Sequence, residues 1–426
     1  MLPSGLRVVT EHMPASHTFS VGYYVGVGSR HESDRSHGAS HFLEHVLFKG
    51  TRRRSAEEIS AAIESVGGDI NAYTAREYTC FYARVLAADA DLAVDVLSDM
   101  LTESRITTAD VEAERAVILD EIAMHADDPG ESVQELVTGQ ILGATGLGRP
   151  VIGSVASISA LSRDQIVRHW RRHYRASSMV VAAAGQVDHD QLVDRLLACD
   201  AGLPTGTPAR PSRATSVNRH GGVLTAVRPL EQCSVALATP SPGLFDDRRY
   251  ALGLLSLILG GGMSSRLFVE IRERRGLTYG IDADEMAYSD AGLWSVDWQC
   301  APDKLPEILR LVRRILTDVA QSGVSPAELT RVKGQMRGQT VLSYEGPGSR
   351  MSRLGVNSLA SDERTLAELL DSFDAVTAEQ LQREAAALFA QPPVLGVVGP
   401  RVSRQGLEAV LRDWVAVAAA DGGTGR

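Results

Sequence analysis

The chain has 426 residues, with 53 acidic side chains against 43 Lys and Arg, a formal net charge of -10 and 44% hydrophobic residues. This composition excludes a disordered chain, a collagen and a disulfide-rich scaffold. The acidic balance argues against a nucleic-acid-binding protein, whose affinity depends on Lys and Arg that neutralise phosphates, and leaves basic peptides open as partners. At about 100 to 200 residues per domain, the length predicts two or three domains.

The N-terminal residues contain no basic segment followed by an apolar stretch, and the apolar runs are shorter than the roughly 18 residues that cross a bilayer. The four cysteines, Cys80, Cys199, Cys233 and Cys300, lie far apart and form no CxxC pair. That spacing predicts reduced thiols. We therefore expect a cytoplasmic protein that binds neither membranes nor nucleic acids.

The first half of the sequence is predicted to mix strands with helices. In chain order, we expect a strand over 19–28, a helix over 37–48, two strands within 69–86, helices near 89–103, 108–126 and 131–142, a capped helix from 161 and a strand over 179–185. Sequential pairing of this kind favours an α+β sandwich over a doubly wound parallel sheet.

The second half repeats this order after about 214 residues. The strand at 233–239 begins 214 residues after the strand at 19–28, and the helix start at 376 follows the one at 161 by 215 residues. Since the register drifts so little, we expect two homologous α/β-sandwich domains that arose by internal duplication.

A stretch between the halves, 202–212, is rich in Pro and Gly and lacks apolar periodicity, which predicts a linker. We place an N-terminal domain at 1–200, the linker at 201–216 and a homologous C-terminal domain at 217–426.

The helix expected over 37–48 contains His41, Glu44 and His45, which the helical period places on one face. Two imidazoles one turn apart can hold the same metal ion, but a catalytic zinc site normally has three protein ligands. The third ligand must therefore come from elsewhere in the chain. His169 and His173 have the same spacing with no acid between them, and we interpret them as structural.

The helix expected near 108–126 supplies two acids, Glu114 and Glu121, which lie seven residues apart and therefore on one face. We predict a capped amphipathic helix with Val117, Ile118 and Met124 among its apolar positions. Glu114 could be a solvated helix acid.

The segment 41–51 reads HFLEHVLFKGT, and its H-x-x-E-H order is inverted relative to the H-E-x-x-H of the zincins. It strongly resembles the pitrilysin and insulinase superfamily of zinc metallopeptidases. Glu114 with Glu121, the segment 259–268 (LGGGMSSRLF) and the segment 272–279 (RERRGLTY) agree with that superfamily in order and spacing. The length and the repeat resemble the short branch, which includes the mitochondrial processing peptidase and its bacterial relatives.

The resemblance implies a peptidase that hydrolyses extended or unstructured peptides with one zinc ion per chain. It assigns the zinc ligands to His41, His45 and Glu121, the general base that takes a proton from the attacking water to Glu44, and support of the metal-binding side chains to Glu114. It assigns polarisation of the scissile carbonyl to Arg272 and Tyr279 in the second domain, and substrate binding to an edge strand with Asn71, Ala72, Tyr73 and Thr74. Gly261 and Gly262 belong to a loop that is either a substrate contact or a helix-ending turn.

In the superfamily, short-branch chains pair, and the Arg/Tyr pair that reaches a given zinc comes from the partner chain. The resemblance thus implies a homodimer, or a heterodimer with a related subunit. The alternative function is a non-catalytic structural or substrate-holding subunit, since the same fold is used by inactive partners. Such chains usually lose a zinc ligand or the base, whereas this sequence keeps all of them.

Overall fold

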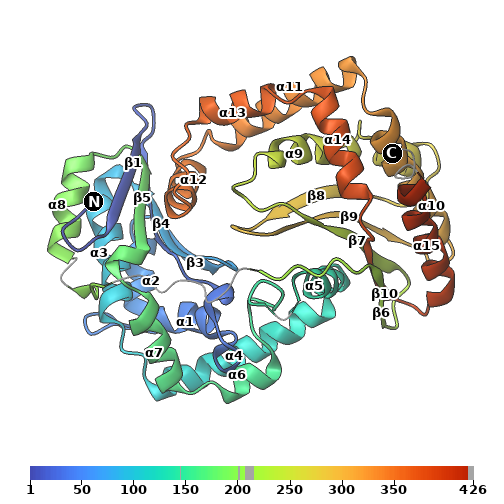
Figure 1. Cartoon of the computed structure of the whole chain (residues 1–426). Coiled ribbons are helices and arrows are strands. Elements are labelled where there is room, and N and C mark those ends of the chain that lie inside the picture. The colour runs from blue at the N-terminus through green and yellow to red at the C-terminus, as the bar shows by residue number, and fades with distance from the viewer. Residues whose placement is uncertain (144, 200–201, 207–214, 421–426) are drawn as a thin grey trace. The chain divides into compact units, whose positions relative to one another are not determined.

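The computed structural model of the chain (Figure 1) describes residues 1–143, 145–199, 202–206 and 215–420. Most of the predicted linker, 201–216, lies outside these residues. The described chain forms two compact units, each built on one five-stranded sheet. Unit 1 comprises 1–123, 149–213 and 340–363, and unit 2 comprises 124–148, 214–339 and 364–426.

The two sheets have the same topology. The strands of unit 1 are β1 (Arg7–His12), β2 (Thr18–Val25), β3 (Asp69–Thr74), β4 (Thr79–Leu86) and β5 (Met179–Gly185), in the order β1-β5-β2-β4-β3. Those of unit 2 are β6 (Gly222–Val227), β7 (Cys233–Ser241), β8 (Ile281–Ala287), β9 (Gly292–Cys300) and β10 (Val394–Gly399), in the order β6-β10-β7-β9-β8. In each sheet the first strand pairs in parallel with the last one, and the other neighbours are antiparallel. The equal strand orders confirm two homologous mixed α/β units.

Helices cover both faces of the sheet in unit 1. The helices of this unit are α1 (Ala39–Leu47), α2 (Ala56–Glu64), α3 (Ala90–Glu103), most of α4 (Thr108–Asp127), α6 (Val155–Ala160), α7 (Arg163–His173), α8 (His189–Cys199) and α12 (Pro347–Leu359). Alternate residues of the strands point to opposite faces. Val21 and Tyr23 therefore join the large core with α1 and α3, whereas Tyr24 packs against Met351 of α12 on the other face.

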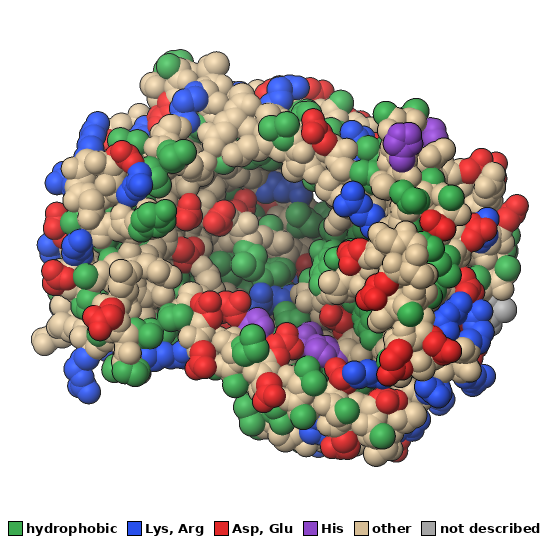
Figure 2. Space-filling model, turned by 180° about the vertical axis from the view of Figure 1, so that it is seen from behind, with side chains coloured by type: hydrophobic (Ala, Val, Ile, Leu, Met, Phe, Trp, Pro, Cys, Tyr) green, Lys and Arg blue, Asp and Glu red, His purple; other side chains and the backbone are tan. Residues whose placement is uncertain are grey.

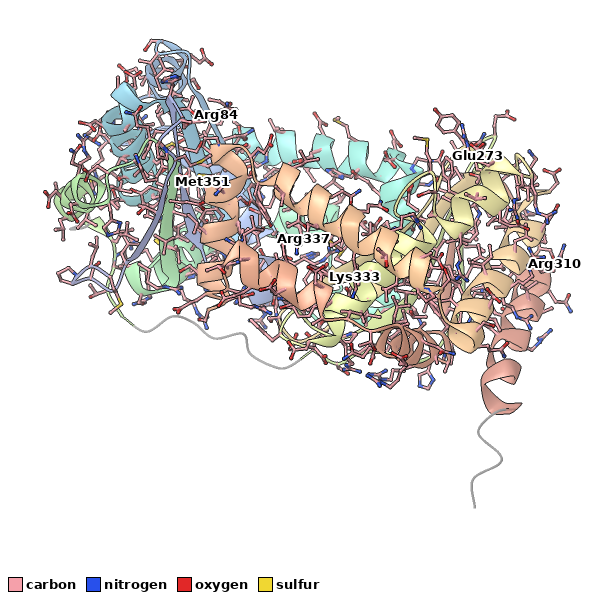
Figure 3. All side chains as sticks on the ribbon, turned by 90° about the horizontal axis from the view of Figure 1, so that it is seen from above. Arg84, Glu273, Arg310, Lys333, Arg337 and Met351 are labelled. Carbon is pink, nitrogen blue, oxygen red and sulfur yellow. The ribbon has the colours of Figure 1, made fainter. Side chains whose placement is uncertain are left out.

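Unit 2 repeats this arrangement with α5 (Pro129–Leu142), α9 (Arg248–Leu259), α10 (Leu305–Ser322), α13 (Leu366–Asp374), α14 (Ala378–Phe389) and α15 (Arg404–Ala420). Most of α11 (Pro326–Ser343) belongs to this unit as well. The main core lies between the sheet and α9, α10 and α14, and α5 covers the other face with Val133 and Val137. Lys333 and Arg337, one turn apart on α11 (Figure 3), both bind Asp374 at the end of α13, through its carbonyl and its carboxylate.

Each sheet is thus covered on one face by a helix from the other half of the sequence. The helix α12, in the second half, belongs to unit 1, and α5, in the first half, belongs to unit 2. The compact units are therefore discontinuous in sequence, unlike the predicted domains 1–200 and 217–426. The boundary at 201–216 stays a prediction about where the sequence repeat divides.

The long helix α4 (Thr108–Asp127) differs from the amphipathic pattern expected for it. Its buried residues are Val111, Glu114 and Ile118, which form one narrow stripe. Val117 and Met124 were expected among the apolar positions, but they are 49% and 73% exposed. They lie on the stripe of Glu121, four residues before it and three after it, so they do not contribute to the core.

The four cysteines are free thiols, as expected. Among the described residues, no helix is both long and apolar enough to cross a membrane. Figure 2 shows Asp and Glu side chains interspersed with Lys and Arg over the visible face. Some charged side chains form ion pairs, such as Arg53 and Arg54, which bind Asp95 and the buried Asp99.

Candidate metal centre

The helix α1 is fixed at both its start and its apolar face. It begins after Gly38, which has φ 87°, and the backbone N–H groups of Gly38 and Ser40 donate to the buried carboxylate of Glu32 at 2.7 Å each. A carboxylate is favoured there because the first N–H groups of a helix lack partners and carry partial positive charge. Phe42 and Leu43 are fully buried in the core. The polar face of α1 is therefore held in one orientation.

Burial, the largest effect, raises the pKa of the Glu32 carboxyl to about 7, against the hydrogen bonds from Ser40 and Gly38. On α7, His169 Nε2 lies 3.0 Å from Ser40 Oγ, and burial lowers the pKa of this imidazole to about 3. The pKa of its neighbour His173 falls to about 4, first through burial and then through the charge of His31. These two histidines are neutral parts of the core beside α1, in agreement with a structural interpretation.

The structure brings His41, His45 and Glu121 together. Their donor atoms all lie within 4.8 Å of one another, and this is the one such group of three found among the described residues. Glu121 Oε2 lies 3.6 Å from His41 Nε2 and 3.5 Å from His45 Nε2. Zinc ligands at about 2.0–2.1 Å in a tetrahedron are about 3.3–3.4 Å apart, so these separations suit one zinc ion.

The three side chains differ in exposure, at 9% for His41, 21% for His45 and 32% for Glu121. Two neutral imidazoles and one carboxylate form a donor set of catalytic zinc sites, which keep a fourth position for water or substrate. The partial exposure of His45 and Glu121 leaves room for such a position. The donor set and the geometry therefore fit zinc.

Glu114 lies behind His45 and is 5% exposed. Its Oε2 is 2.9 Å from His45 Nδ1, and its Oε1 is 2.5 Å from Lys49 Nζ. Because an ionised carboxylate only accepts hydrogen bonds, Nδ1 of His45 carries a hydrogen, and the neutral ring therefore has its lone pair on Nε2, where a metal can bind. Glu114 is thus no solvated helix acid. The sequence prediction missed Lys49, which follows His45 by four residues and lies in the turn after α1.

The pKa of His45 is shifted by opposing effects. Burial, the largest single effect, lowers it, but hydrogen bonds to Glu121 and Glu114 and the negative charges of Glu121 and Glu44 together raise the pKa above its usual value. Binding of a metal at Nε2 must displace the proton that such a pKa favours, so metal binding and proton release are linked.

Glu44 lies between the two histidines in sequence and is half-buried. Thr74 Oγ1 donates a hydrogen bond of 2.5 Å to its Oε2. Burial raises the pKa of Glu44, and the bond from Thr74 opposes that effect. A raised pKa suits a carboxylate that must accept a proton and then release it. The sequence prediction placed Thr74 on the substrate strand but missed this contact.

The predicted substrate residues Asn71, Ala72, Tyr73 and Thr74 lie on β3, an edge strand of the sheet in unit 1. This strand pairs with β4 on one side, so backbone groups on its other side are available to a further strand. An edge of this kind can bind an extended peptide through its backbone.

Arg272 and Tyr279 belong to unit 2, whereas the three donors belong to unit 1. Arg272 lies in a π-helical segment, η6 (Phe268–Glu273), and its guanidinium is 4.9 Å from the ring centre of Phe268 and 5.9 Å from that of Tyr279. Tyr279 is 91% exposed, so its hydroxyl is accessible to a ligand. The two residues predicted to polarise a carbonyl are therefore neighbours.

The glycine loop that contains Gly261 and Gly262 follows the end of α9. Gln335 Nε2 donates to the carbonyl of Gly261 at 2.7 Å, and Gly262 has φ 135°, which favours glycine. The loop ends a helix; its contact with substrate stays a prediction.

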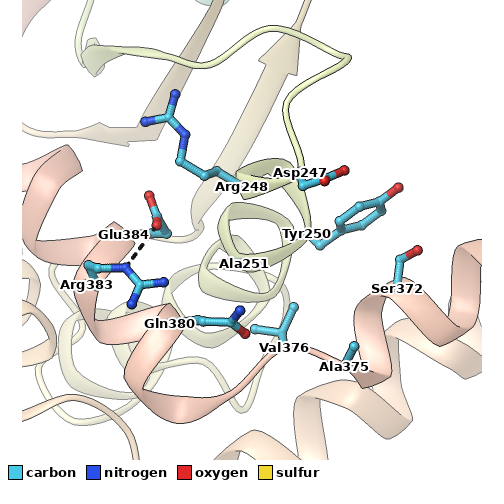
Figure 4. Close-up of a pocket in the computed structure, with 10 residues that line it drawn as sticks. All are labelled: Asp247, Arg248, Tyr250, Ala251, Ser372, Ala375, Val376, Gln380, Arg383 and Glu384. Atoms are coloured by element: carbon cyan, nitrogen blue, oxygen red, sulfur yellow. Dashed lines mark ion pairs between the residues drawn. The ribbon is translucent and has the colours of Figure 1, made fainter.

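A cavity of about 340 Å³ in unit 2 lies beside α9, α13 and α14 (Figure 4). Its wall includes Tyr250 and an ion pair between Arg383 and Glu384 at 3.6 Å. None of the candidate site residues lines this cavity.

Comparison with protein families gives two adjoining matches. The pattern described as Insulinase (peptidase family M16) matches residues 7–155, and the pattern described as Peptidase M16 inactive domain matches residues 160–336.

Curated relatives match over nearly their whole length. The chain is 43% identical over 411 residues to a protein of Streptomyces coelicolor named as an uncharacterized zinc protease, with 95% of this chain and 90% of the relative covered. It is 32% identical over 401 residues to the zinc protease YmxG of Bacillus subtilis, with 93% and 97% covered.

Two solved structures share the fold. A protease from Helicobacter pylori superposes with a TM-score of 0.87 at 20% identity, covering 94% of this chain and 98% of that one. A peptidase M16 inactive domain from Pseudomonas fluorescens gives 0.86 at 19% identity, covering 94% and 97%.

Proposed function

Because the chain belongs to the insulinase family, peptidase family M16, and is a zinc metallopeptidase, we propose that it hydrolyses peptide bonds in extended or unstructured peptides with Glu44 as general base. The observation that carries this proposal is the group of His41, His45 and Glu121, with Glu44 on the same helix as the two histidines. Their donor atoms surround a volume that suits one zinc ion, and the base follows His41 by three residues and directly precedes His45.

Zinc, when bound by these three residues, supplies a Lewis acid that polarises a carbonyl and makes water nucleophilic near neutral pH. Glu44 accepts the proton of the attacking water and passes it to the leaving amine. Glu114 keeps the hydrogen of His45 on Nδ1, which holds the ring in the orientation that a ligand needs. The edge strand β3 aligns the backbone of the peptide.

Arg272 and Tyr279 provide a guanidinium and a phenol, which can donate to the oxygen that becomes negative during attack. Their contact through the face of the Tyr279 ring supports a joint role.

Two substitutions distinguish the role of a general base from that of a zinc ligand. We expect Glu44→Gln to keep one zinc per chain and to lower turnover of a quenched unstructured peptide by at least about a hundredfold, because the amide cannot accept the proton. We expect His45→Ala to lose both zinc and turnover. Glu64→Gln, at the exposed C-terminal end of α2, makes the same chemical change away from the site and should match the wild-type chain.

Zinc content by elemental analysis and the initial rate are measured on the same samples. Loss of zinc in Glu44→Gln would make Glu44 a ligand. Full zinc occupancy without turnover of any unstructured peptide by the wild-type chain would instead support a non-catalytic, substrate-holding subunit.

We further propose that two chains pair and that Arg272 and Tyr279 of one chain serve the metal centre of the other. The chain carries one donor group and one Arg/Tyr pair on different units among its described residues. A mixed dimer of Glu44→Gln and Arg272→Ala chains should then regain activity, because one of its two sites has an intact base and an intact arginine. Activity no higher than that of either variant alone would rule out the arrangement in trans.

A further inference from the structure

The hydrogen bond between Thr74 and Glu44 joins two parts of the candidate site. Thr74 is the last residue of β3, and Glu44 lies in the middle of α1. The hydroxyl of Thr74 donates to Oε2 of Glu44 at 2.5 Å, a short distance for two oxygens. The contact thus connects the strand that is available to a peptide with the carboxylate that takes the proton.

The backbone of Thr74 is fixed independently of this bond. Thr74 pairs with Thr79 in the hairpin of β3 and β4, and the next residue, Ala75, donates its N–H to the carbonyl of Tyr78 at 2.8 Å. A hydroxyl on a fixed backbone restricts the carboxylate that accepts from it, because a Glu side chain otherwise samples several rotamers. The bond uses Oε2, and the second oxygen of a carboxylate can also accept a proton.

We infer that Thr74 is a positioning residue, whose hydroxyl holds Glu44 in the orientation for proton transfer and so links the peptide-binding edge strand to the base. This inference rests on the proposed function of Glu44. The hydroxyl has one hydrogen to donate, and the bond to Glu44 uses it. Under the proposed function, Thr74 would therefore offer a substrate its backbone groups and no side-chain donor.

The first measurement compares turnover in three variants. Thr74→Val keeps the shape of the side chain and removes the donor, whereas Thr74→Ser keeps the donor. We expect Thr74→Val to lower kcat about tenfold with KM within about twofold, since one hydrogen bond to a charged group is lost. Thr74→Ser should recover kcat to within about threefold. Thr10→Val, on the opposite edge strand β1, is the matched control and should leave both constants unchanged.

Two further measurements do not depend on turnover. The zinc dissociation constant of Thr74→Val, from competition with a chelator, should equal that of the wild-type chain. In the zinc-loaded Glu44→Gln chain, Thr74→Val should leave the Kd for a fluorescent unstructured peptide unchanged. If the Thr74→Val chain does not fold, the Thr74→Ala chain, which also lacks the donor, takes its place in these measurements.

The outcomes distinguish a positioning role of Thr74 from substrate binding and from a packing effect. A wild-type chain without turnover defeats the proposed function and this inference with it. An active wild type with an unchanged kcat in Thr74→Val defeats the inference alone. A weaker peptide Kd in the Glu44→Gln background would show that the hydroxyl binds substrate, and an equal loss of kcat in Thr74→Ser would show a packing effect; either result overturns a positioning role.

Discussion

At the scale of single residues, the Glu114 carboxylate has a defined task for each oxygen. One oxygen accepts from the imidazole of His45, and the other binds the ammonium of Lys49. Glu114 is only 5% exposed, and a buried charge is costly unless it is paired. Lys49 pairs with that charge at one oxygen and leaves the other oxygen to accept from Nδ1 of His45.

Removing this compensation should weaken metal binding. We expect Lys49→Met to raise the zinc dissociation constant by about tenfold, the lower end of the effect of losing an outer partner of a ligand, because Lys49 acts on His45 only through Glu114. Lys49→Arg, which keeps the charge, should lie within a few-fold of the wild-type chain. Chelator competition measures the constants, with Lys304→Met in unit 2 as the matched control. An unchanged constant in Lys49→Met would show that Glu114 acts without Lys49.

The spacing of the motif predicted that His41 and His45 could share a metal ion, and the family resemblance implied Glu121 as a ligand and Glu114 as its support. Neither predicted the contact between Thr74 and Glu44. His41 and His45 are one turn apart on a single helix, so the period of the helix alone places them together. Glu44 and Thr74 are separated by 30 residues, and their contact depends on how β3 packs against α1. No local pattern encodes that packing. The catalytic and binding roles of the predicted residues remain predictions.

At the scale of elements, α12 shows how closely a helix can approach a sheet. A Cβ atom on Gly355 would lie 2.2 Å from the ring of Tyr24, and one on Gly22 would lie 2.8 Å from the same ring. The aromatic ring therefore fits between the helix and the strand because both positions are glycine. Met351 of α12, seen in Figure 3, packs in the same cluster.

Strand and helix positions were predictable from local patterns, whereas the partners of some helices were not. The strands expected at 179–185 and 233–239 correspond to β5 (Met179–Gly185) and β7 (Cys233–Ser241). For α4, the prediction that Val117 and Met124 lie on the apolar side of the helix was wrong, since both are exposed. Hydrophobicity alone does not reveal which stripe of this helix faces the core. The stripe is set by tertiary packing, which here buries Glu114 and exposes Met124.

At the scale of the whole molecule, the two halves of the sequence exchange helices: each half contributes one helix to the unit built mainly from the other half. Unit 1 contains the segment 340–363 with α12, and unit 2 contains the segment 124–148 with α5. The repeat in sequence predicted two domains of equal topology, and the equal strand orders agree with it. The repeat could not predict the exchange. The order of strands and helices in each half is the same whether a helix packs on the sheet of its own half or on the other sheet.

The exchange predicts that the first half of the chain does not fold by itself. In the intact chain, Tyr24, Val180 and Ala182 on one face of the sheet are fully buried. A fragment of residues 1–206 lacks α12, so this face would be exposed to water. Such a face promotes aggregation or a loosely packed state that binds a hydrophobic dye. Co-expression with residues 215–426 as a separate chain supplies α12 and should restore a soluble complex with one zinc per pair of fragments. Elemental analysis, dye binding and near-ultraviolet circular dichroism of both preparations test this expectation. If the fragment 1–206 alone were monomeric, had a native near-ultraviolet spectrum and bound zinc as tightly as the intact chain, α12 would be dispensable for unit 1 and the exchange would have no energetic role.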